Sequence, residues 1–324
     1  MAMTIRSVAA AAAASLLSWA VGSAVAQDYP NRPLRIIVPF AAGGGADALA
    51  RLLGQRFNES LRQPAVVENR AGAGGNIGAE LVVKSPPDGY TLMLSTASIA
   101  VNRTLYPKLT FDLRKDLVAI TQMASSVIVL TTHPSVPARN VKELVALARN
   151  TKGGLNFGSN GTGTTSHLSG VLLNQMARMP LSHIPYKGVA PAIIALLSGE
   201  VEIAFPAVLA AAQYIRSGRM RGLAVTTKQK STALPELPTL DSMYPGFDIY
   251  NWFVLFAPAG TSQAIVNRLN AEVVKALQHP EVKTFMVREG ADAVGNSPAE
   301  AAAFLNGEVE KFARIIRSTG VTLE

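Results

Sequence analysis

The chain contains no cysteine among its 324 residues, so disulfide bonds, thiolate nucleophiles and a lipidated N-terminal cysteine are excluded. It also lacks any run of basic residues interleaved with aromatic ones, although its net charge is +8. The 30 Lys and Arg residues are scattered along the chain, and this distribution argues against nucleic acid as a partner. A dispersed positive field instead favours small anions.

Signatures of several enzyme classes are absent as well. There is no G-x-S-x-G nucleophile elbow, no serine followed three residues later by lysine, and no G-x-x-x-x-G-K-[ST] phosphate loop. The four histidines, at 133, 167, 183 and 279, do not pair at metal-ligand spacing. We therefore expect a protein that is not an enzyme and that uses neither a metal nor a cofactor.

The first 26 residues have the composition of a secretory signal peptide. Arg6 provides a positive start, residues 8–21 form an alanine-rich apolar stretch, and Ala24-Val25-Ala26 matches a small-residue cleavage site. The apolar stretch is short for a membrane span, and no second long apolar stretch follows it. We expect export to the periplasm with cleavage after Ala26, which leaves a soluble chain of 324 − 26 = 298 residues.

Short β-like runs alternate with helical patterns over most of the remaining chain. The expected strands include residues 34–38, 65–68, 90–94, 155–158, 183–186, 201–205 and 222–226. Alternation of this kind predicts an α/β architecture with largely parallel sheets.

Two segments are longer than a typical strand. Residues 117–132 are nearly uncharged and rich in β-branched side chains, and residues 247–257 surround Trp252. We interpret them as two crossings between two lobes, with a ligand cleft between the lobes. The predicted first lobe consists of residues 27–124 and 249–324, and the second of residues 125–248.

A glycine-rich turn follows the first strand and opens a helix near Asp47. Gly43-x-Gly45-x-x-Ala48 fits a dinucleotide fingerprint, and Glu68 stands where a ribose-binding acid is expected. Three residues, 40–42, separate the strand from the glycines and lengthen the turn, which argues against the nucleotide interpretation. The other interpretation is a backbone site in which Gly44 allows close approach or a positive φ.

A second loop of small and polar residues, 158–167, lies between an expected strand and a helix that begins near Thr164. Exposed amides at a helix N-terminus, with hydroxyl groups beside them, form an anion site. Alternatively, Thr164 or Thr165 only caps the helix. Two such loops from different lobes would hold a carboxylate from both sides.

Six segments together resemble the Bug (TctC-like) family, the periplasmic solute-binding proteins of tripartite tricarboxylate transporters. The segments are YPNRPLRIIVPFAAGGGADALAR, VVENRAGAGGNIGAE, PPDGYTL, GSNGTGTTSHL, HIPYKGVAPA and RGLAVTTKQKSTALPELPTLDSMYPGF. The resemblance implies a two-lobed, type II-like Venus-flytrap fold that binds small organic carboxylates or amino acids without catalysis. It also implies the membrane permease subunits of such a transporter as partners, and we expect a monomer.

The resemblance also implies which residues contact the ligand, partly through backbone amides and water. They are Phe40, Ala42, Gly43, Gly44, Asp47, Ser95, Thr96, Ser98, Ser159, Asn160, Thr162, Gly163, Thr164, His167, Tyr186, Lys187, Gly188 and Pro206. Structural roles compete for some of them. Asp47 can stabilise a helix N-terminus, His167 can anchor its loop, Lys187 can be a solvated turn charge, and Phe40 and Tyr186 can belong to the core.

The sequence departs from many relatives at Pro206, where they carry an aspartate. Proline offers no partner for an ammonium group. We therefore expect a ligand without an amino group, such as a dicarboxylate or an aromatic acid. Two alternatives stay open at this point: a binding protein that signals to a receptor kinase, and a Rossmann-like nucleotide-dependent enzyme.

Overall fold

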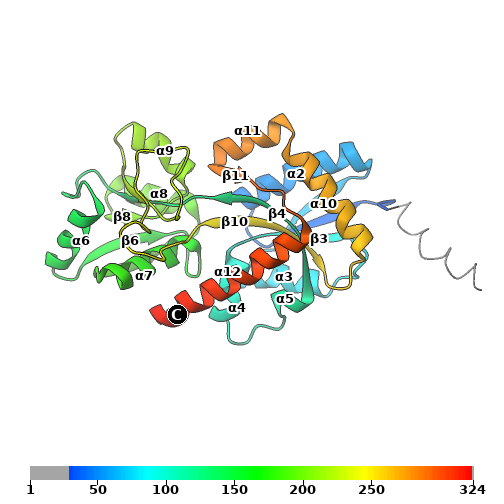
Figure 1. Ribbon diagram of the computed structural model, residues 1–324, viewed down its shortest axis with the longest axis horizontal. Coiled ribbons are helices and arrows are strands. Elements are labelled where there is room, and N and C mark those ends of the chain that lie inside the picture. Colours follow the sequence, from blue (N-terminus) through cyan, green and yellow to red (C-terminus); the bar gives the residue numbers. More distant parts are fainter. Residues whose placement is uncertain (1–28, 323–324) are drawn as a thin grey trace, which may run out of the picture.

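The computed structural model describes residues 29–322 and arranges their strands in two mixed sheets (Figure 1). The six-stranded sheet has the spatial order β11 (Ala291–Ala293), β4 (Leu117–Ser126), β10 (Asn251–Pro258), β3 (Thr91–Thr96), β1 (Leu34–Val38) and β2 (Ala65–Asn69). The five-stranded sheet has the order β7 (Leu181–Pro185), β6 (Leu155–Ser159), β8 (Ile203–Ala204), β5 (Val129–Thr132) and β9 (Arg221–Val225). The two-lobed α/β fold predicted from the sequence is confirmed. The predicted cleavage after Ala26 lies outside the described residues and stays a prediction.

Helices cover both faces of the six-stranded sheet (Figure 1). One face carries α2 (Gly45–Leu61), α10 (Gln263–Leu277) and α11 (Pro280–Glu289), and the other carries the turn η1 (Ala73–Gly75), α3 (Asn76–Val83), α4 (Ser98–Leu105), α5 (Leu113–Asp116) and α12 (Pro298–Thr319). In β1, Ile36 and Val38 pack on the α2 side while Ile37 packs on the α3 side. Successive side chains of a strand point to opposite faces, so a strand covered on both sides has apolar residues on both. Arg35 is the exception in β1, and its partly exposed side chain pairs with Glu68.

The five-stranded sheet carries four helices, α6 (Val141–Asn150), α7 (Thr165–Ala177), α8 (Val189–Ser198) and α9 (Val208–Arg216). Leu144, Leu168 and Leu172 of α6 and α7 pack in one apolar cluster. Leu196 and Ala211 of α8 and α9 pack in another. The second lobe is therefore also a sheet between two helical layers.

The chain passes between the sheets after β4 and returns in β10. β4 ends at Ser126 in one sheet and β5 begins at Val129 in the other. β10 runs antiparallel to β3 and β4, and β5 runs antiparallel to β8 and β9. The expectation of largely parallel sheets is therefore wrong, because strands that enter from the other lobe oppose the local βαβ direction. The lobe boundaries predicted after residues 124 and 248 stay a prediction.

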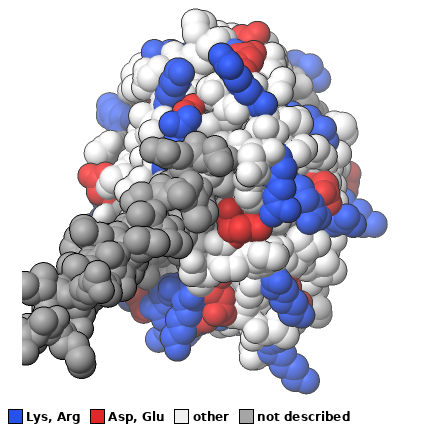
Figure 2. Space-filling model, turned by 90° about the vertical axis from the view of Figure 1, so that its right-hand side faces the viewer, with Lys and Arg blue, Asp and Glu red and all other residues white. Residues whose placement is uncertain are grey.

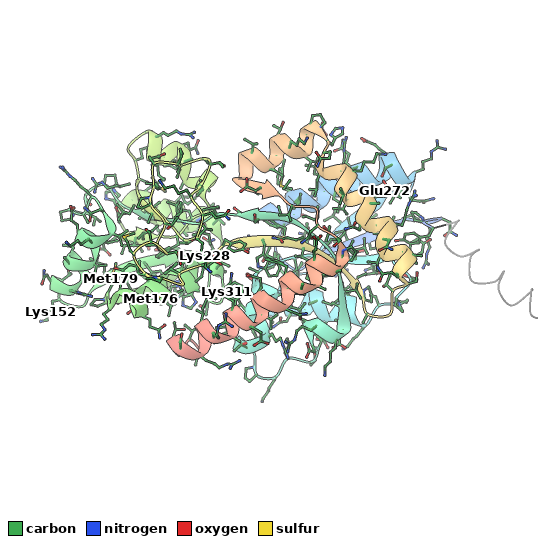
Figure 3. All side chains as sticks on the ribbon, in the orientation of Figure 1. Lys152, Met176, Met179, Lys228, Glu272 and Lys311 are labelled. Atoms are coloured by element: carbon green, nitrogen blue, oxygen red, sulfur yellow. The ribbon has the colours of Figure 1, made fainter. Side chains whose placement is uncertain are left out.

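The C-terminal helix α12 contacts both lobes. It packs against α4 and β4, and its end reaches α7 of the second lobe (Figure 1). There Gln175 Nε2 donates to the Ser318 carbonyl at 2.7 Å, and Ser318 Oγ donates to Gln175 Oε1 at 3.2 Å. Figure 3 shows Lys311 on α12. A single buried apolar cluster extends from Val101 in α4 to Leu168 in α7, so the lobes share a core on this side.

Charged side chains are dispersed over the outer end of the first lobe. Figure 2 shows Lys and Arg interspersed with Asp and Glu on that face. Ion pairs of the first lobe include Arg32 with Asp88 at 2.7 Å and Arg35 with Glu68 at 2.7 Å. Across residues 29–322, no helix has the length and apolar character needed to cross a membrane.

Candidate functional site: a cavity between the lobes

A cavity of about 600 Å³ lies between the two lobes. The predicted ligand residues that line it are Phe40, Gly44, Asp47, Thr96, Ser98, Asn160 and Thr164. The first five come from the six-stranded lobe and the last two from the other lobe. Ser126 and Asn251, at the ends of the crossing strands, complete the wall. The size is suitable for a small organic ligand.

Five helix N-termini from both lobes meet at this cavity. Gly44 precedes α2, Ser98 begins α4, Thr164 precedes α7, Val189 begins α8 and Ala207 precedes α9. All five residues line the cavity. The first N–H groups of a helix have no partner within the helix, and its N-terminus carries a partial positive charge. The cavity wall therefore favours an anion.

Asp47 is the one acidic residue among the described cavity-lining residues, and its charge is already compensated. Its side chain is buried, Oδ2 accepts from the Gly43 amide at 3.0 Å, and Oδ1 lies 3.0 Å from Arg51 Nη2. Burial acts to raise the pKa of Asp47, but the hydrogen bonds from Arg51 and Gly43 outweigh it, and the pKa is lowered. Asp47 thus stays ionised and bound to its own helix terminus.

The second-lobe loop is held in shape by its own side chains. Thr164 caps α7 by accepting from the His167 amide at 3.4 Å, and it donates to the Gly161 carbonyl at 2.7 Å. Gly163 has φ +79°, and a side chain there would come within 2.8 Å of Leu105 in the first lobe. Because both conditions exclude other residues, glycine at 163 lets the lobes approach each other beside the cavity.

His167 lies behind this loop and not in the cavity wall. Its Nδ1 accepts from the Gly163 amide at 3.2 Å, and its ring stacks on His183 with centroids 3.9 Å apart. His183 Nε2 lies 2.6 Å from Ser159 Oγ. Burial, with the neighbouring His183, lowers the pKa of His167 to about 3, and burial lowers the pKa of His183 to about 4. Both rings are therefore neutral supports of the loop near neutral pH.

The remaining predicted residues surround the cavity without lining it. They are Ala42, Gly43, Ser95, Ser159, Thr162, Gly163, His167, Tyr186, Lys187, Gly188 and Pro206. Some of them position the residues that do line it: the amides of Tyr186 and Gly188 donate to the carbonyls of Ser159 and Asn160 at 3.0 and 3.2 Å. The Tyr186 hydroxyl donates to Glu200 at 2.7 Å, away from the wall. Their contact with a ligand stays a prediction.

The contribution of α9 to the cavity wall was not predicted from the sequence. Ala210, Gln213 and Arg216 line the cavity at intervals of three residues, which places them on one face of the helix. The segment is otherwise alanine-rich, and it follows the strand end at Phe205, which also lines the cavity. Two polar side chains three residues apart in an apolar helix were the available signal.

The features that suggested a nucleotide site have other roles. Glu68 accepts from Arg35 Nε at 2.7 Å and pairs with Arg70 at 3.0 Å, outside the cavity wall. The hydrogen bond from Arg35 contributes most, and together these contacts lower the pKa of Glu68 to about 2. Within the described chain, no three His, Cys, Asp or Glu side chains are grouped to hold a metal ion.

Replacing Gly44 with valine is expected to weaken ligand binding by about tenfold, the effect of losing one charge-assisted hydrogen bond, while the protein stays folded. A positive φ was one of the two expectations for Gly44, but its φ is −86°, so valine suits the backbone. A β-carbon at Gly44 would have the Ala41 carbonyl oxygen at 4.0 Å as its nearest neighbour, so only the cavity loses space. Calorimetric titration with a bound carboxylate measures the change.

Gly307→Val is the matched control, because a β-carbon on that α12 residue meets no neighbour within 4 Å and Gly307 does not line the cavity. It should bind with unchanged affinity. If Gly44→Val and the parent protein bind the ligand with equal affinity, this loop does not contact the ligand.

Comparison with known proteins identifies the family. Residues 49–321 match the family model TctC, described as the tripartite tricarboxylate transporter family receptor. Protein BugT of Bordetella pertussis is 37% identical over 302 residues, covering 92% of this chain and 93% of BugT.

Two solved structures have the same fold and bound acids. R. palustris Rpa4515 with adipate has a TM-score of 0.82 and 33% identity, covering 91% of this chain and 99% of that one. MatC from Rhodopseudomonas palustris with bound malate has a TM-score of 0.79 and 29% identity, covering 89% and 100%. With its anion-favouring cavity between two lobes, this chain belongs to the TctC (Bug) family of tripartite tricarboxylate transporter receptors, periplasmic solute-binding proteins that are not enzymes.

Proposed function

We propose that the protein captures a small organic carboxylate in the cavity between its lobes and delivers it to the permease subunits of a tripartite tricarboxylate-type transporter. The meeting of five helix N-termini from both lobes is the observation that carries this proposal. Adipate and malate, bound by the two relatives, are both dicarboxylates and support the same ligand class. The favoured ligands are a dicarboxylate or an aromatic acid.

Among the described residues that line the cavity, no carboxylate is free to pair with an ammonium ion. Pro206 follows Phe205 at the end of β8, and its carbonyl already accepts from the Val129 amide at 2.9 Å. Asp47, the one acid among the described lining residues, is engaged by Gly43 and Arg51. An unpaired charge buried in the cavity is strongly unfavourable. Ligands without an amino group should therefore bind more tightly.

We expect succinate and benzoate to raise the melting temperature where aspartate and glutamate do not. At one hundred times its dissociation constant, a ligand adds about 2.7 kcal/mol of stability, which corresponds to a rise of several degrees. Succinate and aspartate form a matched pair, because they differ only in the amino group. Thermal-shift screening, followed by calorimetry, makes the comparison.

Tighter binding of aspartate than of succinate would contradict the amino-free preference and point to Asp47 as the counter-charge. A panel of mono-, di- and tricarboxylates and aromatic acids that leaves the melting temperature unchanged throughout would overturn the proposed function itself.

A further inference from the structure

Helix α9 brings an unpaired positive charge to the cavity. Arg216 and Asp47 are the two charged residues among the described lining residues, and Asp47 is neutralised by Arg51 at 3.0 Å. Arg216 forms no ion pair with any acid whose side chain the structure describes. The net charge that the side chains contribute to the wall is therefore that of Arg216.

The guanidinium of Arg216 has unused hydrogen-bonding capacity. Its single protein hydrogen bond, from Nη2 to the Ala233 carbonyl, is 3.3 Å long. By contrast, Arg221 donates to the carbonyls of Val136, Ala138 and Pro134 at 2.8, 2.9 and 3.3 Å and has a structural role. A guanidinium carries five N–H donors in a planar fork that matches a carboxylate. Arg216 can therefore accept a second partner.

Arg216 stands at the opposite end of α9 from the helix N-terminus at the cavity. From Ala207 to Arg216 the helix axis advances roughly 13 Å, at about 1.5 Å per residue. Long side chains on a helix point back toward its N-terminus, which shortens the gap to several ångström. The carboxylate carbons of four- to six-carbon diacids are separated by roughly 4–7 Å. Gln213 lies between the two ends on the same helix face.

We infer that Arg216, with Gln213, binds the second carboxylate of a dicarboxylate whose first carboxylate lies at the helix N-termini. The inference rests on the proposed function and narrows it. A bidentate Arg–carboxylate pair increases the affinity for a ligand with a second carboxylate. An aromatic acid with one carboxylate leaves the guanidinium without this partner. Arg216 thus selects dicarboxylates over monocarboxylates.

Calorimetric titration with two matched pairs of acids tests this: adipate against hexanoate, and succinate against butyrate. The parent protein should bind each diacid more tightly than its monoacid. Arg216→Ala should weaken adipate binding by about tenfold and hexanoate binding by less than about twofold. Gln213→Ala should produce a smaller loss for adipate alone.

Arg219→Ala is the control, because Arg219 has the same charge, lies three residues further on and stacks on Tyr214 outside the cavity wall. It should leave both affinities unchanged, and circular dichroism should show that every variant is folded. Equal losses of adipate affinity in the Arg216 and Arg219 variants would show that only the overall positive electrostatic field of the protein matters. That result would overturn the inference.

Two further results would overturn it. In the first, the parent protein binds hexanoate or benzoate as tightly as adipate, and Arg216→Ala changes neither; the proposed function survives this result. In the second, the parent protein binds neither these acids nor any other acid of the wider carboxylate panel, and the proposed function falls with the inference.

Discussion

Replacing Trp252 with alanine is expected to lower the free energy of unfolding by roughly 3–5 kcal/mol, the range for deleting a large buried aromatic side chain. Trp252 is fully buried at the start of β10, the strand that returns to the first lobe. Its ring packs edge-on against Phe304 of α12 with centroids 5.6 Å apart, and Nε1 donates to Glu308 Oε2 at 2.9 Å. Guanidinium titration followed by circular dichroism measures the loss.

Trp252→Phe separates packing from hydrogen bonding. Phenylalanine retains much of the apolar contact but removes the N–H donor to Glu308, which is buried and keeps its ion pair with Lys311 at 2.6 Å. An unsatisfied buried acceptor costs about 1–3 kcal/mol, so this variant should be intermediate. If Trp252→Ala lowers the free energy of unfolding by less than about 1 kcal/mol, the contact of this side chain with α12 does not stabilise the packing of α12 on β10.

Acidification from about pH 6.5 to about pH 4 is expected to destabilise the protein through His167 and His183. Their pKa values in the folded protein, about 3 and about 4, lie below the ordinary 6.5 of an unfolded chain. Within this window the unfolded state binds more protons, so the free energy of unfolding falls as the pH falls. For His167, which is 5% exposed, the slope is at most roughly 1.4 kcal/mol per pH unit.

Denaturant titrations of the ligand-free protein at several pH values give this slope. His183→Gln retains a polar partner for Ser159 but removes one titrating group, and it should flatten the slope between pH 6.5 and 4. His133→Gln is the control, since His133 bonds to the exposed Ser135 at 2.7 Å and lies outside the stacked pair. Identical slopes in the parent protein and His183→Gln would exclude His183 as a cause.

Ligand binding should respond only below about pH 4, where the histidines of the folded protein take up protons, because these side chains support the second-lobe loop. Protonated His167 could no longer accept from the Gly163 amide, and its charge would face His183 at a centroid distance of 3.9 Å. Asn160 and Thr164 on this loop line the cavity. Between pH 6.5 and 4 the free energy of unfolding should therefore fall while this loop keeps its shape, and binding should weaken only at lower pH.

Local patterns in the sequence were sufficient for the class of the fold and the nature of the site. The run Leu34–Val38 became β1 at the predicted bounds, because an apolar run bounded by turn residues suits a strand buried on both faces. Glycine-rich segments at strand ends became helix N-termini at the cavity, since small residues leave backbone amides accessible. Gly44 and Thr164 were found by this rule.

These local patterns could not predict how segments that are distant in the sequence contact one another or in which direction they run. The antiparallel direction of β10 depends on which lobe the chain enters from, and periodicity within a strand is the same in either direction. The close approach of Gly163 to Leu105, and the contact of Ser318 with Gln175, join residues far apart in sequence. Neither leaves a local signal.

Some properties of the cavity wall follow from the sequence, and others depend on the tertiary structure. The sequence by itself determined that backbone amides and hydroxyls at helix starts would favour an anion, because glycine, serine and threonine produce that chemistry wherever a helix begins. Only the tertiary structure decided that Arg216 lines the cavity while Lys187 does not. Both are basic residues near helix ends, and the packing of α9 against the rest of its lobe, not its composition, turns Arg216 to the wall.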